Sequence, residues 1–236
     1  MNLNPIKQKS RSYEVDVLRG SAIVLMVIFH FCYNLAAFDW WDINTDKQIE
    51  WRIFRKIIVT SFLLAVGMSS YLAYSKQLNV LKLAKSTFKL MAIAALITAG
   101  SLFMYPTTWV YFGIIHFIAV ALPISVLFVR LPHTALMIGV TCLISYQLGW
   151  ISMNPIWSWS TNYIDLPKVT TDLVTFIPWI SAVLVGIYLM HKKLFNLTIS
   201  ANKVSNALAL FGQHSLAIYL IHQPIMYGAM LAISKT

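Results

Sequence analysis

The first long apolar segment, residues 16–34 (DVLRGSAIVLMVIFHFCYN), constrains this chain most, because it carries a cation and an imidazole within a hydrophobic run. Arg19 and His30 are eleven residues apart. On a helix they therefore project from one face, about 16 Å apart along the axis. Three further residues share this stripe: Asp16, Ile23 and Met26. Polar groups cost free energy to bury in a bilayer, so the stripe predicts a site inside a helix bundle.

The composition predicts the fold class. Of the 236 residues, 58% are hydrophobic and 11% are charged, whereas soluble domains carry about 25% charged residues. The apolar runs are long and show no strict alternation, which favours membrane helices over a barrel. We expect an all-α polytopic membrane protein, a single domain over residues 1–236 whose first span is retained. The expected seven transmembrane helices cover residues 17–38, 53–75, 86–104, 110–130, 134–151, 171–190 and 207–233.

The basic residues predict an orientation rather than a nucleic-acid partner. The formal net charge is +10, but the 18 Lys and Arg are scattered between the apolar spans. Twelve of them fall on the side of the N-terminus and six on the opposite side. The positive-inside rule therefore predicts a cytoplasmic N-terminus and an external C-terminus. The two cysteines, Cys32 and Cys142, lie in separate spans without CxxC spacing, which indicates neither a disulfide framework nor a metal site.

Three histidines are expected at similar membrane depth. In a hydrocarbon core of about 30 Å, His30 lies about 18 Å and His222 about 22 Å from the inner edge. His116 lies about 9 Å from the outer edge. A single such histidine often only hydrogen-bonds a neighbouring helix, but three together with Arg19 favour a functional cavity. A three-histidine zinc site is disfavoured because no i, i+4 pair exists, and we predict no metal.

Other polar and aromatic residues suit the same cavity. Gln223 and Pro224 directly follow His222, and the proline frees a backbone carbonyl one turn earlier. Asp172 begins the sixth predicted span, where capping that helix is the alternative role. Pro178 and Trp179 are expected to bend the same helix beside the cavity. The external connections, residues 39–50, 102–112 and 150–167, are rich in aromatic residues and fit either an interfacial belt or a sugar-stacking platform.

Four segments carry a resemblance to a known family: VDVLRGSAIVLMVIFH, YFGIIHFI, DLVTFIPWISAVLVGI and HSLAIYLIHQP. Together they resemble the transmembrane acyltransferase superfamily, in particular the bacterial relatives of heparan-α-glucosaminide N-acetyltransferase. Arg19, ten residues and then His30 also resemble the hallmark of the acyltransferase-3 branch. Asn34 departs from the pattern, because many bacterial relatives have aspartate there.

The resemblance implies transfer of an acetyl group from cytoplasmic acetyl-CoA to an amino sugar or glycan at the outer face of a bacterial inner membrane. His30 would act as a base or a transient acyl carrier, with His116 or His222 stabilising the oxyanion. The remaining expected site residues fall into two groups. Those for the acyl-CoA are Arg19, Asp16, Lys85 and Lys89, and those for the acceptor are Asn34, Asp172, Trp179 and Gln223.

Two other functions remain open from the residues. The histidines would also suit a proton-coupled or small-solute transporter, although the spans show no inverted repeat or paired broken helices. A non-catalytic assembly partner is the third alternative. The sequence leaves undecided the acceptor, N- or O-acylation, the acyl chain length, ping-pong or direct transfer, and whether the protein forms a homodimer.

Overall fold

The computed structural model describes residues 12–45, 47–104, 106–164, 166–170, 172–194 and 199–234. Within these ranges the regular secondary structure consists of helices, apart from one isolated bridge between Phe112 and Leu173. The fold is therefore all-α, as predicted. The helices are α1 (Tyr13–Ala37), α2 (Ile49–Tyr74), α3 (Val80–Met104), α4 (Ile114–Phe128), α5 (Pro132–Gln147), α6 (Asn154–Tyr163), α7 (Phe176–His191), α8 (Lys203–Gln213) and α9 (Ser215–Ser234).

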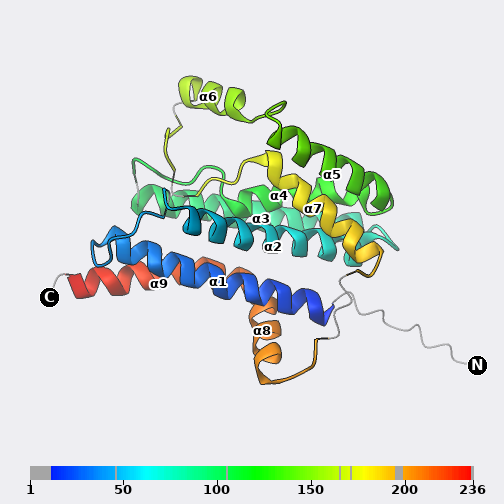
Figure 1. Ribbon diagram of the computed structural model, residues 1–236, viewed down its shortest axis with the longest axis horizontal. Coiled ribbons are helices and arrows are strands. Elements are labelled where there is room, and N and C mark those ends of the chain that lie inside the picture. Colours follow the sequence, from blue (N-terminus) through cyan, green and yellow to red (C-terminus); the bar gives the residue numbers. More distant parts are fainter. Residues whose placement is uncertain are drawn as a thin grey trace, which may run out of the picture.

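The helices lie in layers (Figure 1). Helices α1 and α9 run side by side in one layer, and α2, α3, α4 and α7 lie in the next. Helix α5 packs on α7, while α6 stands apart from the bundle and α8 projects from α1 on the opposite side. The layer of α1 and α9 contacts the other layer mainly through α1 and α2.

Four of the described helices are long and apolar enough to cross a membrane: α1, α2, α3 and α9. Helices α4 and α7 are apolar but shorter, so the predicted count of seven spans is not supported. The predicted span 207–233 is wrong as a continuous helix. It is divided at His214, which ends α8 as its C-cap, and α9 starts at Ser215.

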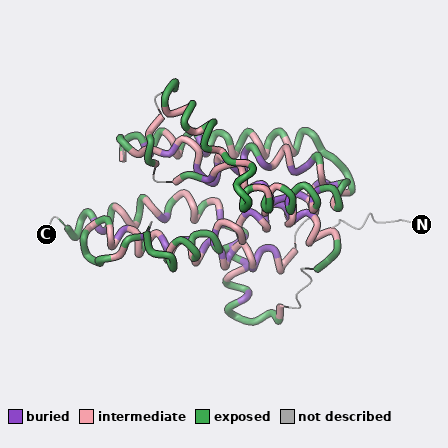
Figure 2. Tube along the Cα trace, turned by 45° about the horizontal axis from the view of Figure 1, so that its top comes forward, coloured by how far each residue is buried: buried purple, intermediate pink, exposed green. Residues whose placement is uncertain are grey.

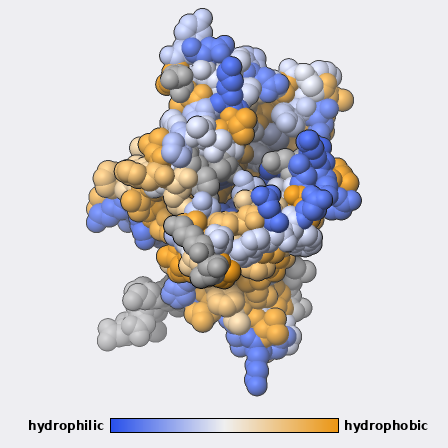
Figure 3. All heavy atoms as spheres, turned by 90° about the vertical axis from the view of Figure 1, so that its left-hand side faces the viewer, coloured by the Kyte–Doolittle hydropathy of each residue, from blue (hydrophilic) through white to orange (hydrophobic). Residues whose placement is uncertain are grey.

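The buried residues form a core on the facing sides of the helices (Figure 2). One cluster joins α2, α4 and α7 through Leu63, Phe117 and Val183, and a second joins α1 and α2 through Ile23 and Ile58. The outward sides carry exposed apolar side chains, of which Phe103 is 88% exposed. Large exposed apolar surfaces are unusual in soluble proteins, so this arrangement indicates a lipid-facing exterior. The view from the end of the molecule shows hydrophobic residues gathered over its lower part (Figure 3).

Helices α2 and α7 approach each other closely at two glycines. A Cβ atom at Gly67 would overlap the carbonyl oxygen of Val183, and one at Gly186 would overlap the carbonyl oxygen of Leu64. Small residues that let backbones approach are typical of membrane helix interfaces. Gly67 and Gly186 are therefore close-packing positions between α2 and α7.

Replacing Gly67 with alanine is expected to destabilise the fold by about 1–3 kcal/mol, because the new methyl group must separate two backbones. The measurement is thermal unfolding of purified protein in one detergent, followed by tryptophan fluorescence. Gly228→Ala is the matched control, since nothing lies within 4 Å of a Cβ atom there. Equal unfolding temperatures for the two variants would show that the close approach contributes nothing to stability.

Candidate active site

Two histidines from distant parts of the chain meet between α1 and α9. Nε2 of His222 lies 3.3 Å from Nδ1 of His30, and the two ring centroids are 4.9 Å apart. His222 is buried, with 8% of its surface exposed. The matching depth predicted for these two residues is confirmed by their contact.

Backbone carbonyls determine which nitrogen carries the proton in each ring. Nδ1 of His222 lies 2.7 Å from the carbonyl oxygen of Tyr219, which can only accept a hydrogen bond. In a neutral ring the proton is therefore on Nδ1, and Nε2 of His222 is an acceptor. Nδ1 of His30 lies 3.0 Å from the carbonyl oxygen of Met26, so it is also the protonated nitrogen. His30 then presents an unprotonated Nε2, the atom that a base or nucleophile requires.

A pair of side-chain amides also joins α1 to α9. Asn34 lies one turn after His30 on α1, and Gln223 directly follows His222 on α9. Gln223 Nε2 donates to Asn34 Oδ1 at 3.0 Å, and Asn34 Nδ2 donates to Gln223 Oε1 at 3.3 Å. Asn34 is 1% exposed. The residue that departs from the family pattern therefore pairs with the neighbour of His222, and no bond from it to His30 occurs among the described contacts. Gln223 lines the cavity described next, whereas Asn34 does not.

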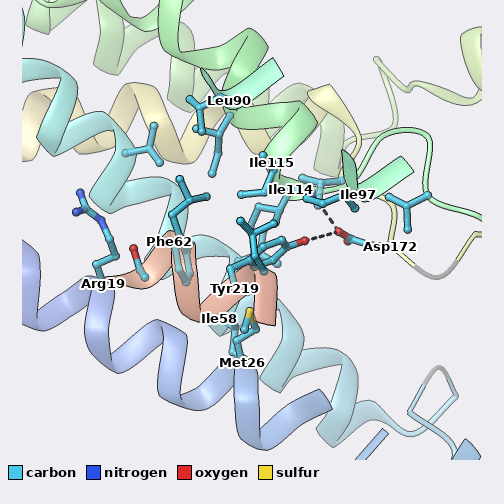
Figure 4. A pocket seen from close by; sticks show the side chains of 18 of the residues that line it. Arg19, Met26, Ile58, Phe62, Leu90, Ile97, Ile114, Ile115, Asp172 and Tyr219 are labelled. Atoms are coloured by element: carbon cyan, nitrogen blue, oxygen red, sulfur yellow. Dashed lines mark hydrogen bonds between the residues drawn. The ribbon is translucent and has the colours of Figure 1, made fainter. Parts of the chain in front are cut away.

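The histidine pair opens into a cavity of about 1460 Å³. Side chains of α1, α2, α3, α4 and α9 line it, together with the connection before α7 (Figure 4). Arg19 lies toward one end of this space, and Asp172 lies toward the other (Figure 4). The same-face prediction for Arg19 and His30 agrees with this cavity, because both residues line it. Of the remaining stripe residues, Asp16 and Met26 also line it, whereas Ile23 is in the core.

The arginine end of the cavity is organised by hydrogen bonds. Arg19 donates to the hydroxyl of Ser69 and lies 3.6 Å from the carboxylate of Asp16. Lys82 lines the same cavity, with its ammonium 5.7 Å from the centroid of the Tyr74 ring. This end therefore combines a fixed guanidinium with a lysine, a pair suited to binding phosphate groups.

Two lysines predicted to bind the acyl-CoA are not in the cavity lining. Lys85 and Lys89 are exposed, whereas Lys82, Ser86 and Leu90 of the same helix line the cavity. These three residues are spaced by four, which places them on one face of α3. Packing against α4, rather than the order of charges, determines which face of α3 points inward, and a role of Lys85 and Lys89 in binding the acyl-CoA stays a prediction.

Asp172 joins three elements at the other end of the cavity. Its Oδ2 accepts hydrogen bonds from the backbone N–H of Ile114 at 3.1 Å and from the hydroxyl of Tyr219 at 3.4 Å. The alternative capping role was assigned to the wrong helix, because Asp172 caps α4 and lies four residues before α7. Burial raises the pKa of this carboxyl in the connection before α7, and the bond from Ile114 partly opposes the shift.

His116 has a different environment from the other two central histidines. Its Nδ1 accepts a hydrogen bond from the N–H of Gly113 at 3.3 Å, and its Nε2 lies 2.9 Å from the hydroxyl of Thr98. Both ring nitrogens thus hold the start of α4 against α3. His116 does not line the cavity, and its described contacts are those of a helix cap.

Aromatic residues contribute unequally to the cavity. Trp179 lines it, and the predicted bend is present beside it, because Ile177 has non-helical dihedral angles inside α7. Trp157 of α6 instead donates from its indole to the hydroxyl of Tyr111 at 2.9 Å. Trp157 and Tyr111 do not line the cavity, so the sugar-platform interpretation of the loop 150–167 stays a prediction.

The comparisons with known proteins agree with this geometry. The family model described as heparan-alpha-glucosaminide N-acetyltransferase, catalytic, matches residues 11–224. The chain belongs to this family. Neither the curated proteins nor the solved structures gave a match. Membership in the heparan-α-glucosaminide N-acetyltransferase family makes the protein a membrane acetyltransferase in general terms, and the matched range contains both histidines of the pair.

Sequence reasoning missed three residues of this heparan-α-glucosaminide N-acetyltransferase family member: Lys82, Ser69 and Tyr219. Ser69 lies in an apolar run without a motif that marks it, yet it accepts a hydrogen bond from Arg19. Tyr219 lies three residues before His222, which places it on the same face of α9. That spacing was available in the sequence and would have identified it.

Removing one amide of the α1–α9 pair is expected to destabilise the protein. Gln223→Leu leaves the buried Asn34 amide without its partner, at a cost of about 1–3 kcal/mol. The double variant Asn34→Leu/Gln223→Leu is expected to be closer to the wild type, because neither amide is then left unsatisfied. Thermal unfolding in detergent measures both variants. A double variant as destabilised as the sum of the single variants would contradict the pairing.

Proposed function

We propose that this protein moves an acetyl group from cytoplasmic acetyl-CoA to an amino sugar or glycan acceptor at the outer face of a bacterial inner membrane. The observation that carries the proposal is the contact between His30 and His222 in a cavity that also contains Arg19. The orientation follows from the excess of basic residues on the N-terminal side. Some of the residues counted, including Lys7 and Lys235, lie outside the described chain.

The cationic end of the cavity supports binding of the acetyl-CoA phosphates. Arg19 is oriented by Asp16 and Ser69, so less side-chain freedom is lost when it binds an anion. Lys82 adds a second positive charge at the cavity wall. The distance of about 16 Å along α1 from Arg19 to His30 is one that an extended pantetheine arm spans. The thioester would then lie beside the histidine pair.

The histidine pair supports acyl transfer at Nε2 of His30. As a base, this nitrogen takes a proton from the acceptor while the acceptor attacks the thioester carbonyl. The C–S bond breaks, the new acyl bond forms, and the proton passes to the coenzyme A thiolate. As an acyl carrier, the same nitrogen attacks the thioester carbonyl first, the C–S bond breaks and the coenzyme A thiolate leaves. The acceptor then attacks the acyl carbon, the bond from this carbon to Nε2 breaks, and the acceptor proton passes to the thiolate. In both routes His222 is a positioning residue, because its Nε2 accepts from Nδ1 of His30.

The size of the cavity favours direct transfer. Pockets for one small ligand typically enclose about 300–1,000 Å³, and this one encloses about 1460 Å³. It therefore has room for the thioester arm and an acceptor together. Trp179, Gln223 and Asp172 line the cavity and are proposed to contact the acceptor. Asn34 would act through Gln223, which it holds in place. His116 is excluded from this mechanism because both of its ring nitrogens have structural partners.

His30→Ala is expected to lower acyl transfer by at least about 10²-fold, because it removes the proposed base. His222→Gln is expected to lower kcat with a smaller change in KM, since the ring of His30 loses its contact with the imidazole of His222 and keeps only that with the Met26 carbonyl. The measurement uses protein in liposomes with radiolabelled acetyl-CoA and glucosamine. His133→Ala, a histidine outside the cavity lining, is the control. Full transfer by folded His30→Ala would overturn the role of His30.

Arg19→Lys is expected to weaken acetyl-CoA binding about tenfold, because lysine keeps the charge but loses the planar fork that holds phosphate. Lys82→Ala is expected to weaken binding in the same direction. Equilibrium binding of acetyl-CoA to purified protein measures both variants. Lys85→Ala is the matched control from the same helix, since Lys85 is exposed and outside the cavity. An equal loss in Lys82→Ala and Lys85→Ala would indicate general surface attraction instead of this site.

A further inference from the structure

The wall of the cavity is an incomplete ring of helices. Around the cavity, α9 packs on α1, α1 on α2, α2 on α4, and α4 on α3. The ring would close if α3 packed on α9, but these two fully described helices form no packed interface. Helix packing therefore leaves the side of the cavity between α3 and α9 unclosed, although Asp172 of the connection before α7 links α9 to the start of α4; we name this side the seam.

The rims of the seam are side chains that both line the cavity and are exposed. On α3 the apolar ones are Leu96, which is 64% exposed, and Gly100. Three charged residues, Lys82 of α3 and Arg55 and Lys56 of α2, also combine exposure with cavity lining, so the seam is distinguished by its apolar rims. On α9 the corresponding residue is Pro224, two positions after His222. Exposure combined with cavity lining is what residues at an opening show.

The seam opens beside the histidine pair rather than at the cationic end. Pro224 directly follows Gln223, whose amide is fixed to Asn34 of α1. On α3, Leu96 and Gly100 lie 14 and 18 residues after Lys82, about 21 and 27 Å along the axis. The opening is thus separated from the groups proposed to bind the donor phosphates, and it lies near the atoms proposed to react with the acceptor.

The surroundings of the seam are apolar. Helices α3 and α9 both have the length and hydropathy of membrane spans, so an opening between them faces hydrocarbon and not water. The cavity wall leading inward from it includes Leu90, Ile97 and Leu220. A free, fully hydrated sugar has no favourable path through such an opening, because its hydroxyl groups would lose their water. A molecule with an apolar chain does have a favourable path, because the chain stays in apolar surroundings.

We infer that the acceptor is a lipid-anchored glycan whose hydrocarbon chain lies in the seam while its sugar head enters the cavity beside His30 and His222. This inference rests on the proposed acyl transfer and adds the chemical class of the acceptor. The anchor remains in the bilayer during the reaction, and only the polar head leaves the membrane environment. Hydroxyl or amino groups of the head then meet the polar side chains near the histidines, and the chain meets the apolar rims.

The test compares one sugar with and without an anchor. Wild-type protein in liposomes receives radiolabelled acetyl-CoA with either glucosamine or dodecyl glucosaminide. We expect kcat/KM to be at least tenfold higher for the anchored sugar. Gly100→Trp fills the seam, because nothing lies within 4 Å of a Cβ atom there. It is expected to lower the ratio of transfer to anchored over free sugar at least fivefold.

Gly228→Trp is the matched control. Gly228 is on α9, has equally open space around its Cβ position and does not line the cavity. We expect it to keep the wild-type ratio, which would exclude a general effect of partition into the membrane. An unchanged ratio in Gly100→Trp, or an equal fall in both tryptophan variants, would overturn the seam as the acceptor route.

A photoreactive group on the dodecyl chain supplies an independent readout. Labelling of peptides from α3 and α9 supports the inference, and labelling only of other helices overturns it. Cross-links between two copies of the chain through α3 or α9 would also overturn it, because a second copy would then cover the seam. These outcomes differ from a failure of the proposed function itself. In that case acetyl-CoA would neither bind to the protein nor transfer its acetyl group to either sugar.

Discussion

The burial of polar side chains in an apolar environment is the constraint on which this structure depends. An imidazole or an amide inside a membrane bundle must find a partner, because lipid offers none. His30 and His222 contact each other, and each also contacts a backbone carbonyl. Asn34 forms hydrogen bonds with Gln223. These contacts all join α1 to α9 or fix a ring on one of them. The same pairing that satisfies the polar groups thus holds in position the nitrogen of His30 that we propose to react.

The cavity separates two chemical environments along one direction. At one end Arg19 and Lys82 suit an anion. At the other end Asp172 and Tyr219 link the start of α4 to α9, so that polar residues of the connections also determine the shape of the site. The proposed donor carries phosphate groups, which suit the end with Arg19 and Lys82. The proposed acceptor carries sugar hydroxyl or amino groups, which suit the end with Asp172 and Tyr219. This difference between the two ends supports the proposal that donor and acceptor approach the histidines from different sides.

Helix periodicity and membrane depth were sufficient to predict the central part of this site. Arg19 and His30 lie on one face because eleven residues complete about three turns, and His222 was assigned to the depth of His30 by counting residues along an apolar run. Depth alone did not determine rotation about a helix axis. His116 was expected at a similar depth, yet its ring is used by Gly113 and Thr98. The choice between Lys82 and its neighbours depended on the packing of α3, which no local pattern encodes. Asp172 accepts a hydrogen bond from the start of α4, a helix distant from it in sequence. The break at His214 divides an apolar run that the sequence predicts to be one span.

The contact between His30 and His222 also constrains the order of events during biosynthesis. The two residues are separated by 192 positions, and the other seven described helices come between α1 and α9. A nascent chain that has inserted every helix except α9 lacks one of the two rings and one of the two paired amides. It has the groups proposed to bind the donor and the contact of His30 with the Met26 carbonyl, but it lacks the contact of His30 with His222. The last of the described helices to emerge from the ribosome is therefore the one that completes the histidine pair, so the proposed transfer would begin only after the whole bundle has been inserted.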